Sequence, residues 1–425
     1  MEQSHLLLGK WRRRIFGTLW LSYAFMYLGR VNMAIALPFI EQELGWTTVT
    51  LGLISGSFYW VYALGQLVNG ALGDHLSPRW FVFVGLVGTA AMNLGFGFSE
   101  TFIPMLLFWS LNGVFQSMGW GPILKTASNW TRPAERNKMS AFLGTTFVLG
   151  SLISWYLSGQ ILSRFDRWEL VFWIPGIVLG LHSLLWVTLI RDHPRDVDLT
   201  LDESSSSTTE HKPALRIYIR ETLIFLRQPK FLFLALITII QGIIKDGISL
   251  WTPSLLVQSH NQSIGVAAIY ALLIPTFGFL GVLLATWFNH KLRGNDELTI
   301  TLLFVIGVAV ALSARLVLTS GSVLALALLI GLCSLIINGI NIVLLSSIPL
   351  RYSNSGKTST LAGFLDFASY VGSGTMTILT GVVVSSWGWQ ALLWVWVALF
   401  VLGGVLMLPR VFSPDTKLAE NPPML

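Results

Sequence analysis

The sequence predicts an all-helical polytopic membrane protein. Hydrophobic residues make up 53% of the 425-residue chain and charged residues only 11%, whereas a soluble globular chain carries about 25% charged residues. Apolar stretches recur along the whole sequence, near the length of about 20 residues that spans a bilayer as a helix. Backbone polar groups in lipid must be hydrogen-bonded within their own segment, so helices are the expected form of these stretches.

Twelve such stretches follow one another along the chain, and one long polar segment divides them into two sets of six. The stretches are residues 15–39, 51–72, 80–98, 102–125, 138–162, 169–190, 231–256, 263–288, 298–319, 322–348, 358–385 and 389–409. We therefore expect an N-terminal six-helix bundle at 1–190, a cytoplasmic linker at 191–230, a C-terminal six-helix bundle at 231–412 and a cytoplasmic tail at 413–425.

The distribution of charge predicts the orientation in the membrane. Most of the 27 Lys and Arg residues lie on one side, in the N-terminal segment, the even-numbered loops and the tail. Cytoplasmic loops are enriched in Lys and Arg, so both termini are expected in the cytoplasm of a multi-pass inner- or plasma-membrane protein. The net charge of +6 then reflects topology, and no nucleic-acid partner is expected. Cys333 is the only cysteine and the seven histidines lack metal-ligand spacing, so neither a disulfide framework nor a metal site is predicted.

Two cations lie within apolar spans at matching places in the two halves. Arg30 is the only charge in 15–39, and Lys245 has only Asp246 beside it in 231–256. A proline follows each cation eight residues later, so a shift of 215 residues superposes the two pairs. A charge at the bilayer centre costs roughly 2.5–3.5 kcal/mol and is seldom kept there without a use. The pattern predicts an anion pocket between two related halves, with one cation from each.

Aromatic and amide groups at membrane depth extend this candidate site. Tyr23 and Tyr27 fall at helical spacing towards Arg30, as residues lining a cavity do, although packing against a neighbouring helix explains them equally well. Other candidates for orienting a substrate, or for bonds between helices, are Gln116, Trp120, Asn341 and Tyr370.

Two acids bear on the charge of the pocket and on coupling. Asp366 lies within 358–385, and an intramembrane carboxylate is by default a functional group or the partner of a cation. Lys245 is its expected partner, in a structural pair or with Asp366 as a proton carrier. Asp246 directly follows Lys245, so its side chain is expected to point about 100° away and to meet another helix. Both acids lower the positive charge, which favours a monoanion.

A third pattern, GALGDHLSPR at residues 70–79, follows the second span. Gly70 and Gly73 allow close approach of helices, and Asp74 and Arg79 bring charge to the same segment. We expect a conformational latch between the halves here, with an ordinary polar turn as the alternative.

The segment 70–79 resembles the signature loop of the major facilitator superfamily. Further segments resemble its organophosphate:phosphate antiporter group, which includes the glycerol-3-phosphate and hexose-phosphate transporters. These segments are 27–38, 116–122, 132–136, 251–253 and 362–364. The resemblance implies twelve helices in two bundles and a secondary transporter, not an enzyme. Such a transporter moves a small organic anion, in this group a sugar phosphate or other organophosphate in exchange for phosphate, by alternating access. It needs no cofactor, and a monomer is expected.

Position by position, Arg30 matches the first substrate-binding arginine of that group. Lys245, Gln66 and Thr146 stand where the group usually has a second arginine, a lysine and a histidine. Arginine grips phosphate through two parallel bonds whereas lysine is a point charge. A proton-coupled symporter of a sugar acid or other carboxylate is therefore an alternative, and a transporter-like sensor of a phosphorylated solute is a second. No P-loop pattern occurs in the sequence, so ATP-driven transport is not predicted.

Overall fold

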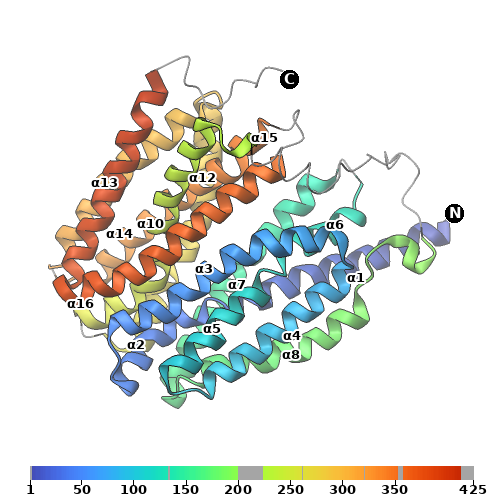
Figure 1. Ribbon diagram of the computed structural model, residues 1–425, viewed down its shortest axis with the longest axis horizontal. Helices are drawn as coiled ribbons and strands as arrows, with labels where there is room; N and C mark the ends of the chain where they lie inside the picture. Colours follow the sequence, from blue (N-terminus) through green and yellow to red (C-terminus); the bar gives the residue numbers. More distant parts are fainter. Residues whose placement is uncertain are drawn as a thin grey trace. The chain divides into compact units, whose positions relative to one another are not determined.

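A computed structural model describes residues 2–132, 135–199, 224–260, 262–319, 321–352 and 358–412, and these residues form helices and no strands (Figure 1). The elements are α1 (Glu2–Leu28), α2 (Asn32–Leu44), α3 (Thr48–His75), α4 (Pro78–Gly97), α5 (Phe102–Gln116), α6 (Trp120–Asn129), α7 (Arg136–Phe165), α8 (Leu170–Leu189), η2 (Pro194–Val197), α10 (Pro229–His260), α11 (Ile264–Ala271), α12 (Leu273–Lys291), α13 (Asp296–Val317), α14 (Val323–Ile342), η3 (Val343–Ser347), α15 (Ile348–Leu350) and α16 (Thr358–Phe412). Most of the predicted linker, residues 200–223, and the predicted tail at 413–425 lie outside the described residues.

Ten helical segments of the described chain are long and apolar enough to cross a membrane, and each of the twelve predicted spans has a helical counterpart. The numbers differ for two reasons. The helix α16 holds two predicted spans, which meet at Gly388, where φ is 75° and ψ is 176°. The predicted span 102–125 is divided between α5 and α6, which have 15 and 10 residues. Each of these helices alone is too short to cross a membrane. The predicted fold class is confirmed.

The described chain packs as two compact units. Unit 1 comprises the described residues of the ranges 1–36 and 64–212, and unit 2 comprises those of 37–63 and 213–425. Most of α2 and the first part of α3 therefore pack with helices from the second half of the sequence. The predicted division into bundles at 1–190 and 231–412 stays a prediction.

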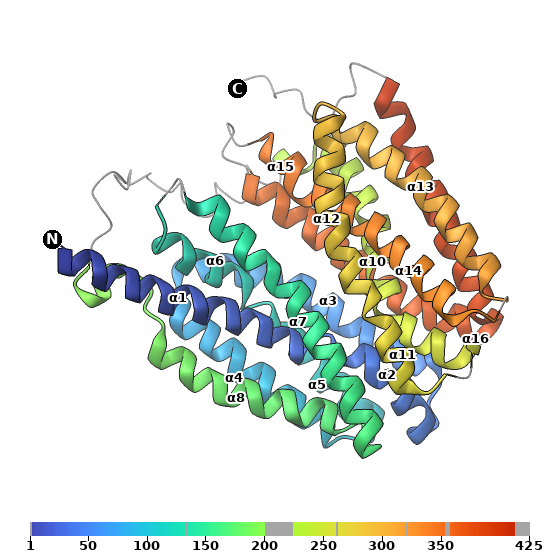
Figure 2. The same ribbon diagram turned by 180° about the vertical axis from the view of Figure 1, so that it is seen from behind.

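In unit 1, α4 packs along both α5 and α8, and α1 packs along α7 (Figure 2). Leu19, Trp130 and Trp186 are fully buried in its core. Small residues allow close contact in places: a Cβ added at Gly88 of α4 would lie 2.1 Å from the Phe115 ring of α5. These contacts hold the middle of α1 against the other helices of unit 1.

In unit 2, α10 packs along α16, while α12 packs along α14 and α13 contacts both α14 and α16. Glycines bring the α10 and α16 backbones together. A Cβ at Gly242 would lie 2.1 Å from the carbonyl oxygen of Ser369, and one at Gly372 would lie 2.3 Å from that of Ile239. The polar side chains of α10 therefore meet the facing turns of α16.

Candidate functional site

Arg30 lies at a break in the first membrane helix. The helix α1 ends at Leu28 and α2 begins at Asn32, so the single helix predicted for 15–39 is interrupted beside the cation. The amides of Arg30 and Val31 both donate to the carbonyl oxygen of Tyr27, at 3.2 and 3.1 Å. Broken helices at membrane depth occur where other parts of the protein satisfy the freed backbone groups.

Side-chain amides from α4 and α5 provide that compensation. The carbonyl oxygen of Gly29 accepts hydrogen bonds from Nδ2 of Asn93 and Nδ2 of Asn112, at 3.1 and 2.8 Å. The carbonyl oxygen of Met26 accepts one from Nε2 of Gln116 at 2.9 Å. Asn93 and Asn112 have no exposed surface. Because each amide is fixed on a packed helix, the break has a defined geometry.

The start of α2 is held in the same way. Nδ2 of Asn32 donates to Oδ1 of Asn93 at 3.2 Å and to the carbonyl oxygen of Val171 at 3.0 Å. The indole of Trp155 in α7 donates to the carbonyl oxygen of Val31 at 2.9 Å. We call Asn32, Asn93, Asn112 and Gln116 the amide cluster. It positions the backbone on both sides of Arg30.

Aromatic residues link Arg30 to α6. The guanidinium of Arg30 lies over the Tyr27 ring, 5.4 Å from its centre. Tyr27 meets Tyr23 edge to face with ring centres 5.6 Å apart, and Tyr23 contacts Trp120 at 4.6 Å. The structure thus brings together four of the predicted site residues. Gln116, a fifth, lies nearby with its amide bonded to the α1 backbone.

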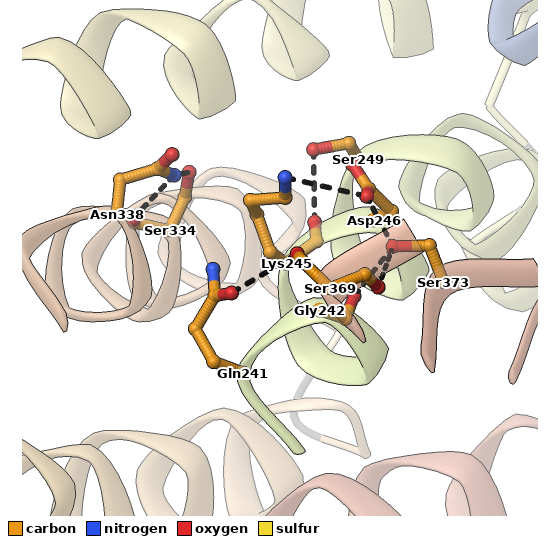
Figure 3. A network of polar contacts seen from close by, with 9 residues as sticks. All are labelled: Gln241, Gly242, Lys245, Asp246, Ser249, Ser334, Asn338, Ser369 and Ser373. Carbon is orange, nitrogen blue, oxygen red and sulfur yellow. Dashed lines mark hydrogen bonds and ion pairs between the residues drawn. The ribbon is translucent and has the colours of Figure 1, made fainter. Parts of the chain in front are cut away.

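In unit 2, Lys245 lies on α10, which continues as a helix through Lys245 and Pro253 to His260. The ammonium of Lys245 is 3.4 Å from Oδ2 of Asp246, and the two side chains are 16% and 14% exposed (Figure 3). The same ammonium lies over the ring of Tyr370, 5.3 Å from its centre. Lys245 therefore has a carboxylate and a π-face as neighbours.

Asp246 also meets α16, as its position on the helix predicts. Ser373 donates to Oδ2 of Asp246 and lies 3.2 Å from the carbonyl oxygen of Gly242 and 2.9 Å from that of Ser369 (Figure 3). Ser369 in turn donates to Oε1 of Gln241 at 3.2 Å. The polar face of α10 thus has hydrogen-bonding partners on the opposite helix.

The other predicted residues of unit 2 lie on α16 and α14. Tyr370 contacts Tyr62 at 4.7 Å and Tyr59 at 6.3 Å between ring centres. Asp366 lies half-buried one helical turn before Tyr370, and its predicted pairing with Lys245 stays a prediction. Oδ1 of Asn341 is buried and accepts no hydrogen bond from the described residues.

The predicted latch segment begins as helix, because α3 continues to His75. Gly70 lies within this helix, and the side chain of Asp74 lies outside the described residues. The carbonyl oxygen of Gly73 accepts a hydrogen bond from Nζ of Lys125 at 2.8 Å, which caps the end of α3.

Arg79, the other charged residue of this segment, is bonded within unit 1. Its Nε donates to the carbonyl oxygen of Val187 at 2.8 Å, and its amide donates to Oδ1 of Asp192 at 2.8 Å. A latch role for this segment stays a prediction.

Sequence reasoning missed three residues of the site. Asn93 is the only side-chain amide in the predicted span 80–98, and Asn112 shares 102–125 with Gln116. An amide in an apolar span was the available signal, but the sequence did not show that these amides bond to a broken neighbouring helix. Ser373 resembled the other hydroxyl residues of α16, and only packing singles it out as the partner of Asp246.

Comparison of the sequence with known proteins identifies one matching family. The sequence model of the Major Facilitator Superfamily matches residues 19–377. A probable hexose phosphate transport protein of Chlamydia trachomatis is 24% identical, with 97% of this chain and 93% of the relative covered. The glycerol-3-phosphate transporter of Bacillus subtilis is 26% identical over 89% and 87% of the two chains. The membrane sensor protein UhpC of Salmonella typhimurium is 22% identical over 94% and 91%.

A solved structure shares the fold. The inward-facing, unoccupied form of a bacterial homologue of the human lysosomal transporter Spinster matches with a TM-score of 0.76 at 16% identity. The match covers 95% of this chain and 99% of that structure. At this identity the likeness concerns the fold alone.

Proposed function

The chain belongs to the Major Facilitator Superfamily, and from this premise we propose that it transports a small phosphorylated solute, of the sugar phosphate or glycerol phosphate class. Membership in a family of membrane transporters also confirms that the chain is not an enzyme. The names of its relatives support the substrate class, since they include a hexose phosphate transport protein and a glycerol-3-phosphate transporter.

The observation that carries this proposal is the helix break at Arg30. A guanidinium at membrane depth is costly and is seldom kept there without a function. The amide cluster fixes the backbone that bears it. Preorganised donors bind an anion without first having to reorganise. Arg30 is therefore proposed to bind the phosphate group through two parallel hydrogen bonds.

Lys245 is the second proposed phosphate-binding cation. Its side chain is largely buried, with 16% of its surface exposed. Tyr23, Tyr27, Trp120 and Tyr370 surround the two cations within their own units and are proposed to contact the organic part of the solute. Neutralisation of the cations by the solute lowers the cost of closing the site, which favours transport by alternating access.

We further propose that both termini lie in the cytoplasm, because Lys and Arg are concentrated on the side of the termini. Cysteines placed at position 6 near the N-terminus and, in a second variant, at position 100 between α4 and α5 test this. A membrane-impermeant maleimide added to intact cells should label only the second, and labelling of the first alone would reverse the orientation.

Flux through the purified protein tests the function. Proteoliposomes that contain the wild-type chain and are loaded with inorganic phosphate or unlabelled ester should take up labelled glucose 6-phosphate or glycerol 3-phosphate. Arg30→Gln should raise the dissociation constant for these esters roughly 10- to 150-fold. This is the loss expected when a charge-assisted hydrogen bond of roughly 1.5–3 kcal/mol is removed. Arg315→Gln is the matched control, since Arg315 bonds to Gln390 near the end of α13.

Each outcome has one meaning. A wild-type protein that binds phosphate esters but moves none would be a sensor. Flux of a sugar acid alone, with phosphate esters neither bound nor moved, would identify a carboxylate transporter. Either result would reject the proposal.

A further inference from the structure

Two arginines meet at one carbonyl oxygen on the surface of unit 1. Nη2 of Arg14, in α1, donates to the carbonyl oxygen of Thr188 at 3.2 Å, and Nη1 of Arg191 donates to the same oxygen at 3.1 Å. Nη1 of Arg191 also donates to the carbonyl oxygen of Ile190 at 2.8 Å. The two guanidiniums therefore lie close to each other, where α1 passes the end of α8.

Two tryptophans hold this arrangement in place. The guanidinium of Arg14 lies over the ring of Trp11, 4.6 Å from its centre, and Trp11 stacks on Trp130 with ring centres 6.2 Å apart. Trp130 is fully buried, and its indole donates to the carbonyl oxygen of Arg191 at 2.8 Å. A closed set of contacts thus runs from one arginine through both tryptophans to the other. Groups held in this way bind a ligand at a low cost in conformational entropy.

The two arginines keep hydrogen-bond donors for a further ligand. In the described part of the chain neither forms an ion pair. The neighbouring carboxylate, that of Asp192, accepts hydrogen bonds from the hydroxyl of Ser77 and the amide of Arg79. A guanidinium has five N–H donors, and the bonds to carbonyl oxygens use only some of them. Two adjacent guanidiniums fit the oxygens of a phosphate group, which arginine binds through parallel hydrogen bonds.

The pair lies at the border of the membrane, on the side of the termini. Arg14 directly precedes the first predicted span, 15–39, and Arg191 directly follows the sixth, 169–190. Phospholipid headgroups occupy this depth, and basic pockets between helices bind the headgroups of anionic lipids. A lipid phosphate is therefore the anion that this position brings within reach of both arginines.

The surface next to the pair suits acyl chains. On α8, three residues within two turns of Thr188 are each more than half exposed, namely Leu181, Leu184 and Leu185. On α1, which packs along α8, no atom lies within 4 Å of a Cβ added at Gly17, one turn after Arg14. Leu21 is exposed one turn further along the same face. On both helices an apolar surface thus continues from the arginines into the membrane.

We propose that Arg14 and Arg191 bind the phosphate of an anionic phospholipid, such as phosphatidylglycerol, whose acyl chains lie along α1 and α8. The phosphodiester of this lipid carries one negative charge and has two unesterified oxygens, one for each guanidinium. In a zwitterionic lipid the cationic group of the headgroup offsets that charge. The lipid site is distinct from the proposed solute site at Arg30, so the inference does not rest on the proposed function.

Native mass spectrometry of the purified full-length protein tests the lipid site. Phosphatidylglycerol and phosphatidylcholine with the same acyl chains are titrated onto the detergent-solubilised wild type, Arg14→Gln and Arg191→Gln. We expect the wild type to bind one phosphatidylglycerol with a lower dissociation constant than any phosphatidylcholine. Each substitution should raise that dissociation constant at least about tenfold, as expected for the loss of a charge-assisted hydrogen bond. Arg14→Lys keeps the charge and should weaken binding less than Arg14→Gln.

Arg13→Gln is the matched control. Arg13 is the exposed neighbour of Arg14 on α1, and its side chain bonds to the Gly9 carbonyl oxygen of its own helix. This variant changes the net charge by the same amount and should bind phosphatidylglycerol as the wild type does. Glycerophosphoglycerol, which is the headgroup without its acyl chains, and inorganic phosphate test the role of the chains. Neither compound in large excess should displace the bound lipid.

Each contrary result has a definite meaning. Equal affinity of the wild type for the two lipids would overturn the inference without the use of any variant. An equal loss of affinity in Arg13→Gln would mean that the general positive charge of the N-terminal segment attracts the lipid, and would overturn it too. Displacement by glycerophosphoglycerol or by phosphate would identify a site for a soluble anion and reject the lipid. All three results would leave the proposed transport of phosphate esters standing.

Discussion

The side-chain amide of Asn112 donates a 2.8 Å hydrogen bond to the carbonyl oxygen of Gly29, the residue immediately before Arg30. A residue of α5 thus completes a backbone bond that α1 itself does not make. Asn93 of α4 bonds to the same oxygen, so two helices more than sixty residues further along the chain complete the site of Arg30.

Asn112→Ala should therefore destabilise the protein and impair binding together. The Gly29 carbonyl oxygen would keep Asn93 as a donor, so the loss is that of one hydrogen bond, roughly 0.5–1.5 kcal/mol. A less fixed break should also weaken the binding of phosphate by Arg30. Thermal unfolding in detergent and calorimetric binding measure the two effects. The matched control is Asn338→Ala, because Asn338 bonds to Ser334 of its own helix. Equal losses in the two variants would argue against a special role for the break.

Lys245→Arg should keep the protein competent to bind phosphate esters, whereas Lys245→Gln should not. Arginine keeps the charge beside Asp246 and adds a second parallel hydrogen bond to phosphate. The dissociation constant of Lys245→Arg should be equal to or lower than that of the wild type, and that of Lys245→Gln at least about tenfold higher. Similar weakening in both variants would mean that the charge of Lys245 does not serve binding.

Gly242→Ala should separate α10 from α16. Its Cβ would lie 2.1 Å from the Ser369 carbonyl oxygen, and overpacking of this kind costs typically 1–3 kcal/mol. Gly363→Ala on α16 is the control, since no atom lies within 4 Å of its added Cβ and alanine favours the helix by roughly 0.5–1 kcal/mol. Melting temperatures should fall for the first variant and stay or rise for the second. A fall in both would point to a general intolerance of α10 and α16 to substitution.

The ion pair between Arg12 and Glu135 should make stability depend on pH. Burial acts to raise the pKa of Glu135, but the hydrogen bonds from Arg12 and the Arg132 amide, with the charges of both arginines, lower it below its ordinary value of 4.5. A depressed carboxyl pKa contributes stability above the unfolded value, and this contribution disappears as pH falls through the folded pKa. Glu135→Gln should thus melt below the wild type at pH 7, and the difference should shrink below pH 4.5. A difference that is the same at both pH values would show that charge is not the cause.

The fold class could be predicted because the length and hydrophobicity of each span are properties of its own residues. The helical spacing of Tyr23 and Tyr27 likewise predicted a common face, and they do contact each other next to Arg30. The two spans within α16 were predicted as separate helices, and Gly388 divides them in the structure.

The break at Arg30 was not predictable from its own segment. The residues 15–39 form an apolar run, and nothing in it requires an interruption. The compensating amides, Asn93 and Asn112, lie more than sixty residues further along the chain. The ion pair between Lys245 and Asp246 was not predicted for a related reason. Adjacent residues on a helix point in different directions, and the long, flexible lysine side chain brings its ammonium to 3.4 Å from the carboxylate.

The α1–α2 segment is interrupted and α10 is continuous, so the two cations at matching places in the sequence are held in position in different ways. The backbone around Arg30 is held by hydrogen bonds from other helices. Lys245 instead depends on charged and aromatic groups that its own flexible side chain reaches. Deep mutational scanning should reveal this asymmetry as a wide, distributed sensitivity around the first cation and a narrow one, confined to a few turns of α10 and α16, around the second.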